Sequence, residues 1–259
     1  MLTSILVFSS LALAIFLAMC ALLYFGQESF IFYPRPNDAV LIEQWRPHRV
    51  EITSGGTTLE GWWVENPEAT TSAVIIYFGG NAEDVLYTAA TARQLDARAV
   101  LVVNYRGYGG TRGKPSQAAL FEDALAIHAH VLAKGVPARD IVVMGRSLGS
   151  GVAAMLASER PVGAAILITP YDSLAAVAAH HYSFFPVRLL LKHPFPSADF
   201  AKRTKVPALI LAAEHDNVVP AVHAQRLHEA WSGSETHVLE GMGHNDIEMH
   251  PRYYELINE

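Results

Sequence analysis

The chain has 259 residues, 51% of them hydrophobic, and a formal net charge of −6. Acidic and basic residues are interspersed, with no basic patch, so the composition argues against nucleic acid as a partner. The single cysteine, Cys20, excludes an intrachain disulfide, and the scattered histidines form no H-E-x-x-H motif or Cys/His cluster, so we expect no metal.

An uncharged apolar segment comes first, at residues 5–25. As a helix it would extend about 31 Å, which matches the roughly 30 Å hydrocarbon core of a bilayer. We therefore expect a membrane anchor over residues 1–27. A cleaved signal peptide is the alternative, but its apolar part is shorter and follows a basic start. Arginines follow the segment and no Lys or Arg precedes it. This distribution of positive charge favours a cytoplasmic C-terminal domain, but the bias is small and the side of the membrane stays open.

Strand and helix patterns alternate after a proline-containing linker, residues 28–49. Two short β-type runs around a glycine turn predict a hairpin, and short apolar runs further on predict buried strands separated by helices. The expected strands are 50–53, 59–64, 73–78, 99–104, 141–144, 164–168, 208–213 and 237–239, and the expected helices are 83–95, 117–133, 151–158 and 247–256. This alternation predicts an α/β domain over residues 50–259, with a mostly parallel sheet and helices on both faces.

Residues 145–149 read Gly-Arg-Ser-Leu-Gly, a G-x-S-x-G pentapeptide between a predicted strand and a helix of small residues. In this context the pattern is that of a nucleophile elbow. The serine occupies a strained turn that exposes its Oγ, and the glycines let the helix pass close to the strand. The helix N-terminus then directs free N–H groups toward the reaction centre. Ser147 is therefore the candidate nucleophile.

A serine hydroxyl needs a base to take its proton and a carboxylate to orient that base. In hydrolases with this elbow, the acid and then the histidine follow the serine along the chain. Asp216 follows the strand at 208–213, and His244 follows the last strand in a glycine loop. Both come after carboxyl ends of strands, where open α/β sheets bind ligands. We predict a triad of Ser147, Asp216 and His244.

Other residues could take two of these roles. Asp172, which follows the strand at 164–168, is an alternative acid, and Glu214 is another. His215 and His250 are the alternative bases.

A tetrahedral oxyanion needs preorganised N–H donors. One is the N–H of Leu148, directly after the nucleophile, and the second should come from the loop after strand 73–78. We choose Asn81 for the second donor, with Gly80 as the alternative.

Six segments carry a resemblance to a known family: 78–84, 104–116, 145–151, 184–191, 214–220 and 241–246. Together they resemble the α/β-hydrolase superfamily and, more narrowly, the membrane-anchored serine hydrolases of the Bem46 group and of the α/β-hydrolase-domain 13 and 17 type. The resemblance implies the same triad, a short helical lid, and Asn81 and Leu148 amides as oxyanion donors. The chain departs from the family at Gly79, which is usually histidine, and at Asn104, which is usually aspartate.

The lid should lie at about 172–204, between two strands. It contains Phe184 and Phe185, which we expect to bind substrate, because apolar residues above the active edge favour an acyl or other apolar group.

These features predict a monomeric, membrane-anchored serine hydrolase that cleaves carboxylic ester or thioester bonds of small-molecule or lipid acyl substrates. The reaction proceeds through an acyl-enzyme and needs no cofactor. Two alternatives stay open: a catalytically silent, membrane-anchored binding protein on the same fold, and an amidase or peptidase with the same triad.

Overall fold

The computed structural model describes residues 2–259, and its strands form one sheet in the order β1-β2-β4-β3-β5-β6-β7-β8. The strands are β1 (Arg49–Ser54), β2 (Thr57–Glu65), β3 (Val74–Phe78), β4 (Ala99–Val103), β5 (Ile141–Arg146), β6 (Ala164–Ile168), β7 (Ala208–Ala213) and β8 (Ser234–Leu239). β1 and β2 form the expected antiparallel hairpin, and β2 pairs antiparallel with β4. All pairings from β4 to β8 are parallel, so the prediction of a mostly parallel sheet is confirmed.

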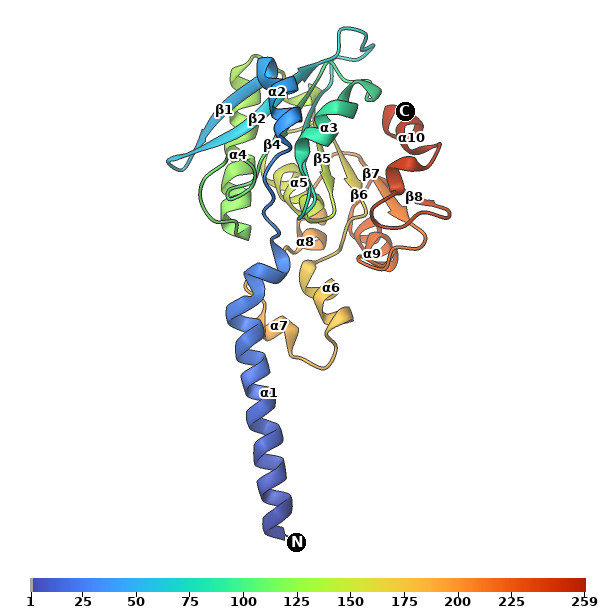
Figure 1. The fold of residues 1–259 in the computed structure, drawn as a ribbon. Helices are drawn as coiled ribbons and strands as arrows, with labels where there is room; N and C mark the ends of the chain where they lie inside the picture. Colours follow the sequence, from blue (N-terminus) through green and yellow to red (C-terminus); the bar gives the residue numbers. More distant parts are fainter. Residues whose placement is uncertain (1) are drawn as a thin grey trace.

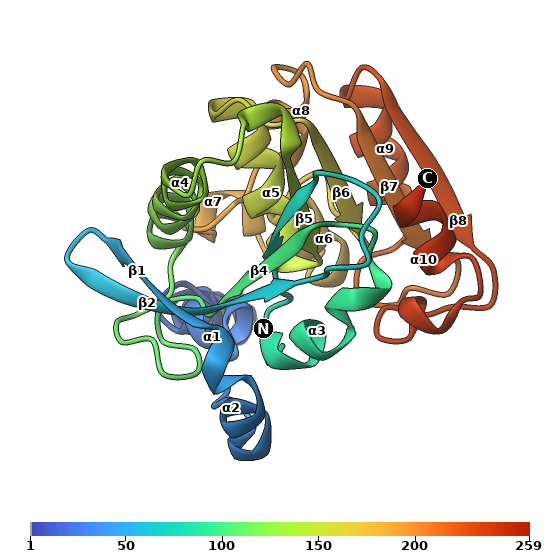
Figure 2. The same cartoon turned by 90° about the horizontal axis from the view of Figure 1, so that it is seen from above.

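Helices cover both faces of this sheet, as Figure 2 shows from above. One face packs against α4 (Gln117–Ala133), α5 (Leu148–Glu159), α8 (Ser197–Ala201) and α9 (Val222–Ala230), and the other against α2 (Ala39–Trp45), α3 (Val85–Thr91) and α10 (Tyr253–Asn258). Every residue of β3 and β4 is buried. Burial on both faces explains why these strands are continuous apolar runs without alternation.

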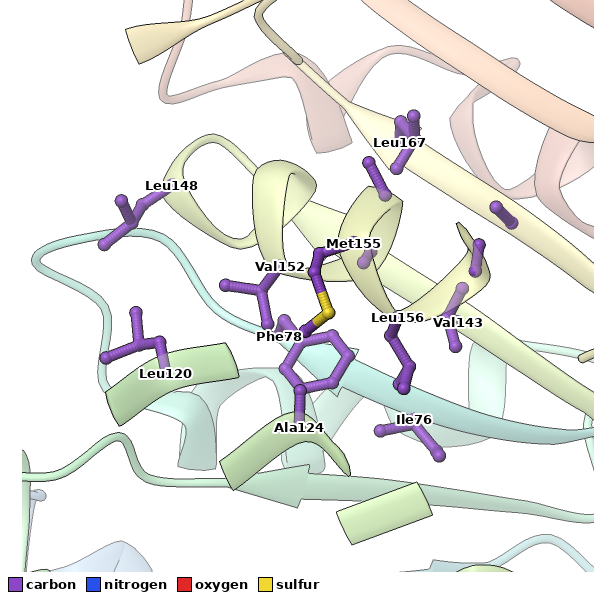
Figure 3. Packing of buried hydrophobic residues seen from close by; sticks show 14 of the residues in the cluster. Ile76, Phe78, Leu120, Ala124, Val143, Leu148, Val152, Met155, Leu156 and Leu167 are labelled. Atoms are coloured by element: carbon purple, nitrogen blue, oxygen red, sulfur yellow. The ribbon is translucent and has the colours of Figure 1, made fainter. Parts of the chain in front are cut away.

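The part of the core next to the predicted elbow includes the contact between α5 and β3. Phe78 packs with Val152 and Met155 of α5, and α4 closes this cluster (Figure 3). α5 can approach the sheet closely because its first turn contains Gly149. A Cβ at this position would lie 2.0 Å from the carbonyl oxygen of Phe78. The small residues of the elbow helix therefore determine how near it lies to the strands.

Several expected boundaries differ from the structure, among them that of the helix expected at 83–95, which is α3 followed by a 3-10 turn at Ala92–Gln94. The C-terminal helix predicted at 247–256 is divided into a 3-10 turn, Ile247–Met249, and α10, because Pro251 lacks an N–H and disfavours helix before it. α5 begins at Leu148 rather than at residue 151. β8 begins at Ser234 rather than at residue 237, since the edge position of this strand tolerates polar residues on an exposed face.

Two helical regions lie outside the layers (Figure 1). α1 (Leu2–Ile31) projects away from the domain and is long and apolar enough to cross a membrane. Its C-terminal part lies beside α7 (Val187–Leu190), which together with α6 (Leu174–His181) belongs to the lid segment between β6 and β7. Between α1 and β1 the chain also forms α2, a short helix that the sequence did not predict.

Candidate active site

Ser147 lies on the turn between β5 and α5 with a φ of 49°. A positive φ is strained for a residue with a side chain and persists where the surroundings enforce it. Here the crossing of strand and helix enforces it: a Cβ on Gly145 would lie 2.3 Å from the carbonyl oxygen of Gly149. The Ser147 N–H is also held, donating to the Ile168 carbonyl at 2.9 Å. The backbone therefore has the geometry expected of a nucleophile elbow.

The structure brings Ser147, His244 and Asp216 together. His244 Nε2 lies 2.9 Å from Ser147 Oγ, and His244 Nδ1 lies 2.7 Å from Asp216 Oδ2. The other carboxylate oxygen of the buried Asp216 accepts hydrogen bonds from the N–H groups of Val218 and Val219, at 2.8 and 2.7 Å. With a carboxylate on Nδ1, the favoured tautomer carries its proton there and leaves Nε2 free to accept the serine proton.

The two alternative acids, Asp172 and Glu214, make their contacts away from Ser147. Asp172 Oδ1 is 2.6 Å from His223 Nδ1, outside the Ser147 cluster. Burial would raise the pKa of Asp172, but hydrogen bonds from His223 and from the Ser173 N–H hold that pKa below its usual value. The exposed Glu214 accepts a hydrogen bond from the Gly241 N–H at 2.8 Å.

The two alternative bases are likewise occupied elsewhere. His215 is exposed and lies 3.6 Å from Glu214, and His250 Nδ1 accepts a hydrogen bond from the Arg252 N–H.

The loop after β3 distinguishes the two candidates for the second oxyanion donor. The Gly80 N–H donates to Glu83 Oε2 at 2.8 Å and is therefore occupied. Asn81 lines the same cavity as Ser147 and Leu148, and its N–H has no acceptor within residues 2–259. The Asn81 carbonyl, in contrast, accepts a hydrogen bond from Tyr108 Oη at 2.6 Å, which helps to fix the backbone of this loop.

Glu83 is a functional candidate that sequence reasoning missed. Besides Gly80, its carboxylate accepts hydrogen bonds from Tyr77 Oη and from Thr88 Oγ1, both at 2.8 Å. Burial and then the charge of Glu83 raise the pKa of Tyr77, so the phenol stays a donor. A Cβ at Gly79 would lie 3.1 Å from Val85 and 3.4 Å from the Glu83 carboxyl carbon, so the loop leaves little room for the histidine that the resembling family usually has at this position.

Arg146, the first of the two variable residues of the pentapeptide, was also missed. Its Nη2 donates to the His244 carbonyl at 3.3 Å, and its Nη1 lies 3.4 Å from Glu248 and 4.0 Å from Glu83. One mostly buried guanidinium, carried by the last residue of the nucleophile strand, thus faces the histidine loop and the oxyanion loop. The signal available in the sequence was a charged residue at the end of an otherwise apolar strand.

A cavity of about 550 Å³ leads away from Ser147. Most of its lining is apolar and comes from the lid, from the loop after β7 and, unexpectedly, from α1. The residues contributed by α1 are Leu23, Gln27, Phe30 and Ile31, and those contributed by the lid include Leu174, Val177, Tyr182, Val187, Leu190 and Leu191. Phe184 and Phe185, expected to bind substrate, are not part of this lining; they contact Phe16 of α1 instead.

A family model described as serine hydrolase matches residues 124–257, which is more than half of the chain. An uncharacterised protein of Mycobacterium tuberculosis is 35% identical over 86% of this chain and 82% of its own length. The chain belongs to the serine hydrolase family. This serine hydrolase is also similar to α/β-hydrolase domain-containing protein 17C of Xenopus tropicalis, with 29% identity over 93% of this chain and 76% of the relative. An uncharacterised membrane protein of Saccharomyces cerevisiae is 28% identical over 80% of this chain and 76% of its own.

Solved structures agree on the fold of this serine hydrolase. The esterase Pf2001 of Pyrococcus furiosus superposes with a TM-score of 0.66 at 19% identity, covering 85% of this chain and 92% of the esterase. Est1E of Butyrivibrio proteoclasticus, solved with ferulic acid, gives a TM-score of 0.62 at 18% identity, covering 81% and 94%. The predicted α/β-hydrolase fold and the predicted superfamily are confirmed.

Proposed function

We propose that this serine hydrolase cleaves carboxylic ester or thioester bonds of apolar acyl substrates, with Ser147, His244 and Asp216 as its catalytic triad. The observation that carries the proposal is the position of the His244 ring, with one nitrogen 2.9 Å from Ser147 Oγ and the other 2.7 Å from Asp216. The apolar cavity beside Ser147 supports an acyl group as the part of the substrate that is bound.

In the proposed reaction, Ser147 Oγ attacks the substrate carbonyl while His244 Nε2 takes the hydroxyl proton. The carbonyl oxygen becomes an oxyanion that accepts hydrogen bonds from the N–H groups of Leu148 and Asn81, each worth about 3–4 kcal/mol of barrier. His244 then gives its proton to the departing alcohol or thiol, and an acyl-enzyme remains. Water, deprotonated by the same imidazole, attacks the acyl-enzyme and releases the acid. Asp216 stabilises the imidazolium in both halves, and no step uses a cofactor.

A fluorophosphonate probe tests for the activated serine. We expect wild-type protein to be labelled and Ser147→Ala to be unlabelled. Ser158→Ala is the matched control, because Ser158 lies on the same helix and donates only to the Met155 carbonyl, so this variant should label like wild type. Folded wild-type protein that does not label would overturn the proposal and favour a silent binding protein on this fold.

The bond type needs a separate comparison. Three substrates are compared that share one acyl group and differ in the bond, which is an ester, a thioester or an amide. We expect the enzyme to hydrolyse the ester and the thioester and to cleave little of the amide. Faster amide cleavage would make the protein an amidase or peptidase.

We also propose that residues 1–27 anchor the enzyme in a membrane, that residues 28–49 link the anchor to the hydrolase domain at 50–259, and that it acts as a monomer. The length and apolar composition of α1 support the anchor. The protein should stay with membranes after alkaline extraction, whereas release into the supernatant would contradict anchoring. Protease accessibility in sealed vesicles would then test the cytoplasmic position that the arginines favour.

A further inference from the structure

One face of α1 forms part of the wall of the cavity beside Ser147. Leu23, Gln27, Phe30 and Ile31 follow the spacing i, i+4, i+7 and i+8, which places them on one stripe of a helix. From Leu23 to Ile31 this stripe extends about 12 Å along the helix axis. The cavity therefore reaches from the nucleophile to a residue within the apolar segment at 5–25.

The lid is fastened to this same stripe by Gln27. Its Nε2 donates to the Leu190 carbonyl at 3.0 Å, and its Oε1 accepts a hydrogen bond from the Lys192 N–H at 2.6 Å. Gln27 is buried, and a buried amide is costly unless its hydrogen bonds are made. These two bonds join α1 and the lid into the two walls of one cavity.

The tip of the lid, residues 183–191, extends further along α1, toward the N-terminus. Phe184 and Phe185 contact Phe16, with ring centroids 5.6 and 5.8 Å apart. Phe16 lies about 13 Å of helix before Phe25, the end of the apolar segment, and this is nearly half of a roughly 30 Å bilayer core. When α1 spans a membrane, the lid tip beside it lies in the hydrocarbon of the nearer leaflet. Figure 1 shows the lid beside α1 in this arrangement.

The composition of the lid tip suits this environment. Phe184 is 79% exposed and Leu189 is 84% exposed in the protein alone, whereas soluble surfaces rarely expose such a cluster. Five of its N–H groups, those of Phe185, Val187, Leu189, Leu190 and Leu191, donate to backbone carbonyls within the lid, which lowers the cost of placing this backbone in hydrocarbon.

The charged residues of this region mark the membrane surface. Lys192 Nζ lies over the ring of Tyr24, 4.3 Å from its centroid, at the end of the apolar segment. Tyrosine is enriched at the membrane–water interface, and a lysine near a helix end can extend its charged head to it. Arg188 is the cation of the tip itself, and its long side chain can extend toward that interface.

We propose that the anchor helix is one wall of the acyl-binding site and that the lid tip is inserted in the same leaflet, so that the substrate is an acyl ester or thioester lipid of the surrounding bilayer. Its chain lies between α1 and the lid, and its carbonyl reaches Ser147. This inference rests on the proposed function for the chemistry, but the insertion of the lid does not depend on catalysis.

The first experiment measures the depth of the lid tip. Phe184→Cys in a Cys20→Ala background is labelled with a polarity-sensitive fluorophore and reconstituted in phosphatidylcholine vesicles with nitroxide groups on the acyl chains. We expect blue-shifted emission and loss of most of the fluorescence by quenching. The control is Tyr87→Cys, a 60% exposed position on α3, which should show neither. Equal behaviour at the two positions would overturn insertion of the lid, whether or not the enzyme is active.

The second experiment tests the wall formed by α1. Leu23→Trp enlarges a lining residue, and Leu22→Trp, at a neighbouring position that is 68% exposed, is the matched control. In the full chain, Leu23→Trp should lower the rate on a long-chain ester at least about tenfold relative to an acetyl ester, because overfilled sites are costly. Leu22→Trp should keep the wild-type ratio. Equal ratios in the two variants, with both labelled by the fluorophosphonate, would overturn the α1 wall while leaving the proposed function intact.

The third experiment identifies the source of the substrate. A fluorogenic long-chain glycerolipid ester is placed either in the vesicles that contain the enzyme or in separate vesicles. We expect hydrolysis in the shared bilayer and a large loss of rate across separate vesicles. Equal rates would show that the substrate arrives through water and would contradict entry from the bilayer. If neither arrangement is hydrolysed and wild-type protein is not labelled, the proposed function itself fails, and the fluorophore still reports the position of the lid.

Discussion

The guanidinium of Arg146 donates a hydrogen bond to the main-chain carbonyl of His244 at 3.3 Å. This contact joins the residue before the nucleophile to the residue that we propose as its base. Because Arg146 also faces Glu248 and Glu83, the three loops around the reaction centre share one buried cation. We infer that Arg146 positions His244 relative to Ser147 without touching the substrate.

Arg146→Met should therefore lower kcat by about 10–100-fold with little change in KM, since a small misplacement of a reacting group is costly. Arg146→Lys, which keeps the charge, should recover part of the loss. Arg203→Met is the control, because Arg203 forms an exposed pair with Glu159 at the C-terminal end of α5, opposite the end that carries Ser147. Wild-type kcat in a folded Arg146→Met enzyme would contradict the positioning role.

Asp216 and Asp172 are the two candidates for the acid of the triad, and substituting each by asparagine distinguishes them. Asp216→Asn should reduce kcat by about 10³–10⁴-fold, because the amide favours the wrong tautomer of the histidine. Asp172→Asn should leave kcat within a small factor of wild type, since Asp172 is paired with His223. Steady-state kinetics on one ester decide between them. A larger loss in Asp172→Asn would mean that the acid has been assigned to the wrong residue.

Acid should weaken the junction between α1 and the lid at His193. Its Nδ1 accepts a hydrogen bond from the Gln117 N–H at 3.3 Å, and it lies 3.8 Å from Glu28 of α1. Burial lowers the pKa of His193, and the charge of Glu28 opposes that shift without cancelling it. The unfolded chain therefore binds the proton first, so the stabilisation is complete above about pH 6.5 and is lost as the pH falls below it, by at most about 1.4 kcal/mol per pH unit.

Denaturant unfolding at pH 7.5 and at pH 5.5 measures this loss. The difference between the two pH values should shrink in His193→Gln and should persist in His215→Gln, whose histidine is exposed. An unchanged difference in His193→Gln would assign the acid sensitivity to another group.

The close approach of α5 to the sheet makes Gly149 intolerant of any side chain. A Cβ there would lie 2.0 Å from the Phe78 carbonyl oxygen, so helix or strand would have to move. We expect Gly149→Ala to lower the free energy of unfolding by about 3 kcal/mol or more and to abolish turnover. In Gly26→Ala the new Cβ would meet only the Phe30 ring, at 3.5 Å, so this variant should be stable. Thermal unfolding of both proteins provides the comparison, and a wild-type Tm for Gly149→Ala would refute the packing argument.

The sequence by itself determined the architecture and the three residues proposed for the triad. Apolar runs of five or six residues bounded by turn residues predict buried strands, because such a run has no polar side to face water. The elbow around Ser147 and the positions of Asp216 and His244 after strands followed from the same patterns. Parallel strands bring their carboxyl ends to one edge, so residues distant in sequence could be expected to meet there. The division of the C-terminal helix also has a local signal, because Pro251 disfavours helix at the residue before it.

Only the tertiary structure decided how these parts are held and what surrounds them. The contact of Arg146 with His244 joins residues 98 positions apart, and that of Gln27 with Leu190 joins residues 163 positions apart. Neither pair belongs to a periodic pattern, so neither has a signature in the sequence. Whether α1 would only project from the domain or also line the cavity depended on the direction in which it leaves the domain. That direction is determined by the packing of the lid against the helix, because side-chain contacts across elements form only after the elements are assembled.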